Sequence, residues 1–231
     1  MKKFAVFIFV LLFIFPSIPV SANTTDTESG LVYSIENDEV TIEGWEYEGA
    51  VLNIPETIEG YPVKHISDQA FRGNNSFAEL RLPSSIITIG EYAFAECHNL
   101  VKVVIEGAET IGYSAFRECR ALLSISLPSN LILIDDSAFE NCTMLGKVKI
   151  PASLTKIGVD AFIGCDRIRF DASENSYAKQ YAKQYAIPTS FFDTWEFTVI
   201  LIVVISVTTV TAYFLLTKHL KKRKSLKQKE L

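Results

Sequence analysis

Ile111 to Cys119 read I-G-Y-S-A-F-R-E-C, and close variants of this stretch recur through the middle of the 231-residue chain. An Ala-Phe pair marks each copy, and successive pairs are 22 or 23 residues apart. The five pairs are Ala70-Phe71, Ala93-Phe94, Ala115-Phe116, Ala138-Phe139 and Ala161-Phe162. A fixed period of this length is typical of a solenoid, in which each copy forms one coil and stacks on the next.

Each copy continues beyond the Ala-Phe pair into the pattern of a short β-strand. In one copy, Val103 and Ile105 lie on one face of the predicted strand and Lys102 on the other, because successive side chains of a strand point to opposite sides. A proline ends the pattern in three of the copies. We therefore predict one strand per coil, with alternate side chains pointing into a shared interior.

A second apolar pair follows this strand, as in Leu131 and Ile134. It predicts a second short strand or turn on the opposite wall of the coil. The Ala-Phe pair then places a small residue beside a large one at every level. We expect the phenylalanines to form a column along the axis of the stack, and we interpret this column as hydrophobic core rather than as a ligand site.

The stretch L-L-S-I-S-L-P-S-N that begins at Leu122 resembles the leucine-rich repeat form L-x-x-L-x-L-x-x-N, with isoleucine at one position. The preceding motif I-G-x-x-A-F-x-x-C is similar to that of the BspA-type family of microbial surface proteins. The resemblance covers Leu31 to Pro188. It implies a leucine-rich-repeat solenoid of mostly short parallel β-strands with turns or short helical segments. Ile66-Ser67 and Ile134-Asp135 depart from the motif because they lack its glycine.

The two ends of the repeat region differ from its middle. Residues 31–70 contain strand patterns at Val40–Ile42 and Val51–Ile54, but no Ala-Phe pair before Ala70, which predicts a divergent opening unit. Residues 176–186 carry tyrosines and alanines at helical spacing. We expect a helix here, capped by Ser173 or Ser176 and stopped by Pro188, that covers the last coil.

The four cysteines occupy the same place in successive copies, three residues after the phenylalanine. They are Cys97, Cys119, Cys142 and Cys165. Neighbouring strands are about 4.8 Å apart, but parallel Cα–Cβ bonds do not converge to the ~3.8 Å between Cβ atoms that a disulfide needs. We therefore expect free, buried thiols in tight turns that face main-chain carbonyls. We expect no metal site, because the histidines are scattered and the sequence has no Cys-x-x-Cys motif.

Both ends of the chain have the composition of membrane-targeting segments. Residues 1–22 combine two lysines, an apolar run and a Val-Ser-Ala end, as in a secretory signal peptide. Phe197 to Thr217 contains no charged residue and, at ~1.5 Å per residue, is long enough to cross a membrane as a helix. Seven basic residues follow and predict a cytoplasmic tail. The expected organisation is a signal peptide at 1–22, a flexible segment at 23–30, the repeat ectodomain at 31–188, a linker at 189–196, a transmembrane helix at 197–217 and a basic tail at 218–231.

The formal charge of −5 conceals an asymmetry. Asn23 to Glu196 contain 26 acidic and 13 basic residues, which gives this part a charge of −13. We therefore do not expect the ectodomain to bind nucleic acid, because the phosphate backbone attracts basic proteins. We interpret the basic tail as a topology signal, with binding of anionic lipid as the alternative.

No motif of a known catalytic or phosphate-binding class is present, so we predict neither enzymatic activity nor a cofactor. The resemblance implies a surface module that binds a protein or a glycan, as in adhesion, and the predicted transmembrane helix would anchor this module to the membrane. The alternative is a structural partner of another membrane protein, held close to the bilayer by the linker.

The residues between the inward positions of the strands form the candidate binding face. Basic residues and serines occupy most of its outward positions, as Arg81, Lys102, Ser124, Ser126, Lys147 and Lys149. We weigh two interpretations: a local basic stripe that binds an anionic ligand, and an ordinary solvated surface.

Overall fold

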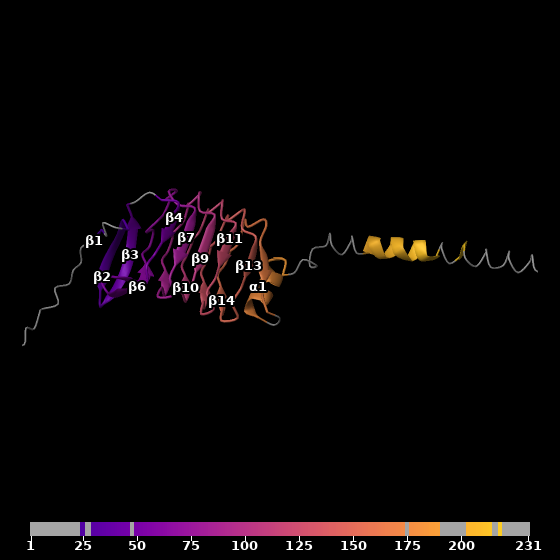
Figure 1. The fold of residues 1–231 in the computed structure, drawn as a ribbon. Coiled ribbons are helices and arrows are strands. Elements are labelled where there is room, and N and C mark those ends of the chain that lie inside the picture. The colour runs from indigo at the N-terminus through magenta and orange to yellow at the C-terminus, as the bar shows by residue number, and fades with distance from the viewer. Residues whose placement is uncertain are drawn as a thin grey trace, which may run out of the picture.

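The computed structural model describes residues 24–25, 29–46, 49–173, 176–189, 202–213 and 217–218. Between residues 29 and 189 the chain winds into coils that stack along one axis, with the first coils at the indigo end and the last at the orange end of Figure 1. The predicted leucine-rich-repeat solenoid is confirmed. Each coil before the last contributes one strand to each of two walls, and the Ala-Phe turn closes the coil on a third side; the last coil contributes β15 and is followed by a helix.

The first wall consists of six strands in the described chain, one from each coil. They are β4 (Val51–Asn53), β7 (Glu79–Leu82), β9 (Lys102–Ile105), β11 (Ser124–Ser126), β13 (Lys147–Lys149) and β15 (Arg169–Asp171). The strands pair in parallel in the order β4, β7, β9, β11, and separately as β13 with β15. Between β11 and β13 the Gly146 N–H donates to the Leu123 carbonyl at 3.3 Å. One face of this wall is the predicted candidate binding face.

The second apolar pairs form the other wall, as predicted. Its parallel strands are β6 (Tyr61–Ile66), β8 (Thr88–Ile89), β10 (Thr110–Ile111), β12 (Leu133–Ile134) and β14 (Lys156–Ile157). Strand β5 (Thr57–Ile58) pairs with β6 as a short antiparallel addition. The buried isoleucines Ile66, Ile89, Ile111, Ile134 and Ile157 lie in register from coil to coil.

The opening unit contains a β-hairpin that the sequence analysis did not predict. Strands β2 (Leu31–Glu36) and β3 (Glu39–Trp45) pair antiparallel, and β3 continues the second wall by pairing with β6. The short strand β1 (Thr24–Thr25) pairs with β2. The turn residues Asn37 and Asp38 both have positive φ, at 51° and 62°. Two such residues are the signature of a two-residue hairpin turn, so the signal was present in the sequence.

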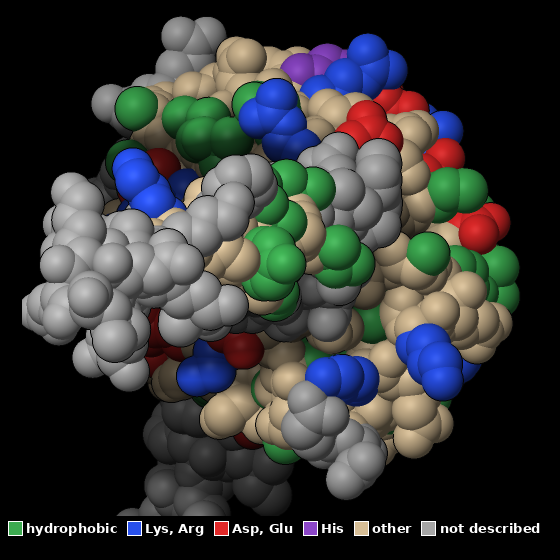
Figure 2. All heavy atoms as spheres, turned by 90° about the vertical axis from the view of Figure 1, so that its right-hand side faces the viewer, with side chains coloured by type: hydrophobic (Ala, Val, Ile, Leu, Met, Phe, Trp, Pro, Cys, Tyr) green, Lys and Arg blue, Asp and Glu red, His purple; other side chains and the backbone are tan. Residues whose placement is uncertain are grey.

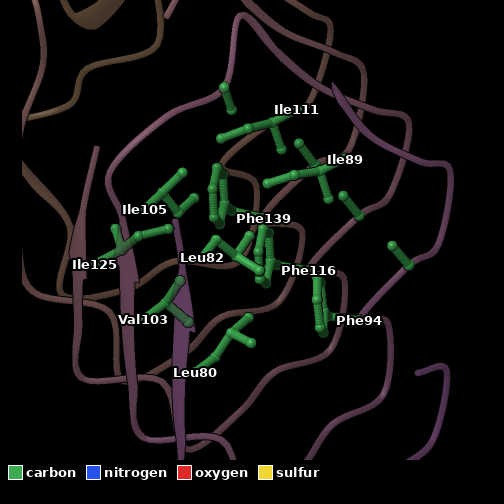
Figure 3. Packing of buried hydrophobic residues seen from close by; sticks show 14 of the residues in the cluster. Leu80, Leu82, Ile89, Phe94, Val103, Ile105, Ile111, Phe116, Ile125 and Phe139 are labelled. Atoms are coloured by element: carbon green, nitrogen blue, oxygen red, sulfur yellow. The ribbon is translucent and has the colours of Figure 1, made fainter. Parts of the chain in front are cut away.

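The phenylalanines of the Ala-Phe pairs form the predicted column. Neighbouring rings of Phe71, Phe94, Phe116, Phe139 and Phe162 lie 4.9 to 5.3 Å apart and within 9° of parallel. In Figure 3 this column stands between the side chains of the two walls, with Leu82 and Ile105 on one side and Ile89 and Ile111 on the other. All five rings are buried. The column is the centre of the hydrophobic core.

The Ala-Phe turn repeats one backbone conformation in every coil. The residue before each alanine and the second residue after each phenylalanine have positive φ, as in Ser114 (51°) and Glu118 (62°). In the coils before the last, main-chain N–H groups at alternate turn positions donate to carbonyls of the next coil. Phe116, for example, donates to the Ala138 carbonyl at 2.8 Å. Each turn is therefore held to its neighbour by a ladder of hydrogen bonds.

The two copies that lack glycine have a structural explanation. In these copies Asp68 and Asp136 follow the exceptional residue, and each carboxylate accepts a hydrogen bond from the next coil, at 2.7 Å from Glu91 N–H and 2.7 Å from Val159 N–H. The glycine of the next coil lies directly against the aspartate. A Cβ at Gly158 would approach the Asp136 carboxylate and main-chain nitrogen to 2.3 Å. Glycine is required at this position because of this close approach.

All four cysteines are free and buried, as expected. Each thiol lies within hydrogen-bond distance of a phenylalanine carbonyl in the preceding coil, at 3.1 to 3.2 Å. The neighbouring Cys97 and burial raise the pKa of the Cys119 thiol well above its ordinary value, and burial has the same effect on the pKa of Cys142. The protonated thiols thus act as small apolar groups with one weak donor.

The predicted capping helix is α1 (Tyr177–Gln184), and it lies at the end of the solenoid beside β14 and β15. Ser176 is its N-cap and accepts a hydrogen bond from Lys179 N–H, which decides between the two serines considered. The predicted tyrosine stripe is only partly buried. Tyr181 packs against Phe170, but Tyr177 and Tyr185 are exposed.

The expected signal peptide at 1–22 and most of the basic tail lie outside the described residues. The expected transmembrane segment at 197–217 is described only in part: residues 202–213 are helical, and their side chains are exposed. Within the described ranges, no helix combines the length and apolarity needed to cross a membrane.

Substitution of Phe116 or Phe139 by alanine should lower the free energy of unfolding by about 3–5 kcal/mol, because each change leaves a cavity in the middle of the column. Chemical denaturation of the purified variants measures this loss. Tyr113→Ala is a suitable control, since Tyr113 is 37% exposed. A Phe116→Ala variant as stable as the parent would contradict the assignment of the column to the core.

The raised pKa values of Cys119 and Cys142 predict an alkaline limit to stability. The unfolded chain loses these protons near the ordinary thiol pKa of 9.0, whereas the folded chain retains them to higher pH. Their contribution is therefore fully present below pH 9.0 and decreases as the pH rises above it. Denaturation curves between pH 7 and 11 should show this loss, and the double variant Cys119→Ala, Cys142→Ala should show less of it.

Candidate binding face

The outward residues of the first wall, β4 to β15, form two columns that run along the solenoid axis. In each of its strands the residue between the two columns is buried, as Leu80 and Val103 are. The first column contains Val51, Glu79, Lys102, Ser124, Lys147 and Arg169, and the second contains Asn53, Arg81, Val104, Ser126, Lys149 and Asp171. We call these twelve positions the strand face.

The structure brings the six predicted site residues together on this face. Arg81, Ser124, Ser126, Lys147 and Lys149 are exposed, and Lys102 is half-buried. Strands β7, β9, β11 and β13 position them because their buried partners fix which side of each strand faces outward. Neighbouring strands are about 4.8 Å apart, so Lys102 and Lys147 stand roughly 10 Å apart on either side of the serine row.

Three charged residues of the strand face lie outside the predicted site: Glu79 on β7, and Arg169 and Asp171 on β15. The fifth copy lacks the proline that ends the strand in others, and no strand was predicted beyond Ile168. The alternation of Ile168 with Phe170 was the signal that could have identified β15. With these additions the face carries five basic and two acidic residues.

The acidic residues stand on the outer side of the lysines. Glu79 lies 3.9 Å from Arg81 and 3.7 Å from Lys102, and Asp171 lies 2.9 Å from Lys147. The adjacent Lys147 holds the pKa of Asp171 below its ordinary value. Exposed ion pairs of this kind contribute only about 0–1 kcal/mol each. An anionic ligand can therefore replace a carboxylate partner at small cost.

The central row of the strand face consists of Ser124 and Ser126. Within the described chain neither hydroxyl has a hydrogen-bond partner, and both side chains are exposed. Lys102 lies on the preceding strand and Lys147 and Lys149 on the following one. The row thus offers two hydroxyl groups between lysines, an arrangement suited to a carboxylate, sulfate or phosphate oxygen.

The Ala-Phe turn side has a different charge arrangement. Its arginines are engaged with glutamates of the same or the next coil, as Arg72 with Glu96 at 2.9 Å and Arg120 with Glu118 at 2.6 Å. The hydrogen bond from Arg120 holds the pKa of Glu118 below its ordinary value. The turn side therefore lacks the excess of basic residues found on the strand face. Among the described residues, no group of three His, Cys, Asp or Glu side chains is placed to hold a metal ion.

Residues 52–177 match the model of the BspA type leucine rich repeat region, in six copies. The chain belongs to this family. The matched range begins at Leu52, in β4, and so includes part of the opening unit. The 22- or 23-residue period lies within the 20–29 residues typical of leucine-rich repeats.

Several solved structures are similar to this chain, including those of two leucine-rich repeat proteins. The leucine-rich repeat protein of T. pallidum, TpLRR, is 28% identical with a TM-score of 0.60, and the match covers 64% of this chain and 71% of that chain. A leucine-rich repeat protein from Bacteroides ovatus is 31% identical with a TM-score of 0.54, over 62% of this chain and 39% of that one. No curated protein shows significant similarity to the sequence.

Proposed function

We propose that the repeat domain is a non-enzymatic binding module of the cell surface, and that its strand face binds an anionic part of a protein or glycan. The observation that carries this proposal is the charge of the face. Five basic residues gather on it in a domain whose sequence from Asn23 to Glu196 has a formal charge of −13. Membership in the family supports it, because repeat solenoids use extended regular surfaces to bind.

The distribution of charge on the face favours a ligand that lies over its middle. Glu79 and Asp171 neutralise the face from the outer strands, while the serine row separates Lys102 from Lys147 and Lys149. A ligand anion above Ser124 meets Lys102 on the preceding strand and Lys147 on the following one. The surrounding acidic surface repels the same anion elsewhere, which gives orientation as well as attraction.

The location of the module is part of the proposal and rests on the sequence of both ends. The apolar run within residues 1–22 supports export, and the charge-free stretch 197–217 followed by seven basic residues supports a membrane anchor with a cytoplasmic tail. The linker 189–196 spans at most about 28 Å at ~3.5 Å per residue. The proposed ligand therefore lies near the membrane.

Heparin and poly-glutamate serve as probes for the two ligand classes. The parent should bind one of these two probes. The triple variant Lys102→Glu, Lys147→Glu, Lys149→Glu should bind that probe at least about tenfold more weakly, equivalent to about 1.4 kcal/mol. Binding by the parent should also weaken with added salt, because the Debye length is ~10 Å at 0.1 M. Titration calorimetry measures the affinity, and thermal denaturation checks the fold. A triple variant that binds like the parent would show that the face is only solvated surface.

The matched control removes negative charge from the same face. Glu79→Gln and Asp171→Asn release Lys102 and Lys147 from their carboxylate partners, so the double variant should bind the same probe more tightly than the parent. An unchanged or weaker affinity would contradict the arrangement proposed here. The two sets of variants change net charge in opposite directions at exposed positions, and neither alters a buried side chain.

Protease added to intact cells should digest the repeat domain and leave only the anchor and the tail protected. Immunoblotting with antibodies against each part measures the outcome. Protection of the repeat domain in intact cells, followed by digestion after permeabilisation, would contradict the proposed orientation.

A further inference from the structure

Among the described residues, the hydrogen-bond ladder of the Ala-Phe turns ends at the last coil. In the coil before it, Ser137, Phe139 and Asn141 donate their main-chain N–H groups to the carbonyls of Val159, Ala161 and Ile163, at 2.8 to 3.0 Å. The corresponding donors of the last coil belong to Asp160, Phe162 and Gly164. None of these three N–H groups has a hydrogen-bond partner among the described residues.

The same three residues line a groove of about 640 Å³ at the C-terminal end of the solenoid. Its opposite wall is the chain that leaves α1, from Tyr185 to Pro188. This chain covers the neighbouring strand, because the Phe170 N–H donates to the Pro188 carbonyl at 2.9 Å. Helix α1 covers β14 in turn. The cap thus closes both walls of the solenoid and leaves the Ala-Phe side open.

Apolar side chains flank the open donors. Ile163 is 53% exposed and Tyr185 39% exposed, and both line the groove. The ring of Tyr185 stacks on Tyr181 at 4.3 Å and so continues the aromatic contacts of the cap to the edge of the groove. The charged lining residues are two aspartates and two arginines. Figure 2, which looks onto this end, likewise shows acidic and basic side chains interspersed around it.

We propose that this groove is a docking site for a polypeptide segment of a partner protein. The segment adds to the last coil as one further Ala-Phe-type turn and gives its main-chain carbonyls to the N–H groups of Asp160, Phe162 and Gly164. The interaction continues the junction that each inner coil makes with its successor. Addition of a chain segment to an open backbone edge is a general mode of peptide recognition.

The placement of the donors decides between a peptide and a small anion. They belong to alternate residues along the turn, and the inner coils show that three carbonyls of a single chain meet such a set at once. The two aspartates and two arginines of the lining balance, so the groove has no net positive charge to attract an anion. A main-chain carbonyl is neutral and accepts a hydrogen bond without such charge, and an apolar side chain of the same segment can pack against Ile163 and Tyr185.

The probe is a synthetic peptide with the sequence of residues 111–122 and the change Cys119→Ser, because this stretch presents the required carbonyls inside the solenoid. Amide hydrogen exchange in the full-length protein is followed by NMR. Without peptide, the amides of Asp160, Phe162 and Gly164 should exchange faster than those of Ser137, Phe139 and Asn141. Saturating peptide should slow all three by at least about tenfold, whereas a scrambled peptide should not.

Ile163→Asp should weaken peptide binding at least about tenfold, because it places a carboxylate against the incoming carbonyls and removes an apolar contact. Ile132→Asp is the matched control, since Ile132 is 44% exposed, directly precedes β12 of the second wall and does not line the groove. Both variants should unfold at similar temperatures. The charge-reversed strand face should bind the peptide normally, which separates this proposal from the proposed function.

Four results would overturn the docking proposal. The free protein would protect all six amides equally, the peptide would leave exchange unchanged, or Ile163→Asp would bind as well as Ile132→Asp. Protection that arises from concentration-dependent dimers without peptide would make a second copy the occupant, and would also overturn it.

Discussion

A single coil of about 22 residues cannot bury its own interior, and every other feature of this structure follows from that constraint. The phenylalanine of each Ala-Phe pair has one ring face for the preceding coil and one for the next. The walls, the buried thiols and the turn ladder repeat at the same interval because each must meet its equivalent in the adjacent coil. Removal of one ring therefore weakens two junctions at once.

Much of the fold could be predicted because the constraint repeats. A residue that recurs in five copies at the same place has the same neighbours, so the inward positions of the strands, the phenylalanine column and the state of the cysteines followed from position alone. The hairpin of β2 and β3 occurs once, and its evidence was limited to Asn37 and Asp38. The choice of Ser176 as N-cap also depends on a single local geometry.

The candidate site was predictable in position but not in its interactions. Alternation along each strand placed Lys102 and Lys147 outward, whereas their ion pairs with Glu79 and Asp171 depend on how side chains more than 20 residues apart meet across coils. Asp171 belongs to the fifth copy, where the repeat pattern weakens near the cap. The sequence could not explain why Ile66-Ser67 and Ile134-Asp135 lack the glycine of the motif. The explanation is a contact between coils, in which Asp68 and Asp136 each accept a hydrogen bond from the next coil, beside its glycine.

The two proposed surfaces differ in how they relate to the core. On the strand face, alternate residues point outward while their neighbours are buried, so its charge can change without disturbing the stack. The C-terminal groove is instead the core interface itself at the place where repetition stops. Its donors and its apolar flank are parts of a further junction that the described part of the chain does not complete. A solenoid therefore creates a site at its end by the same pairing that holds its middle together.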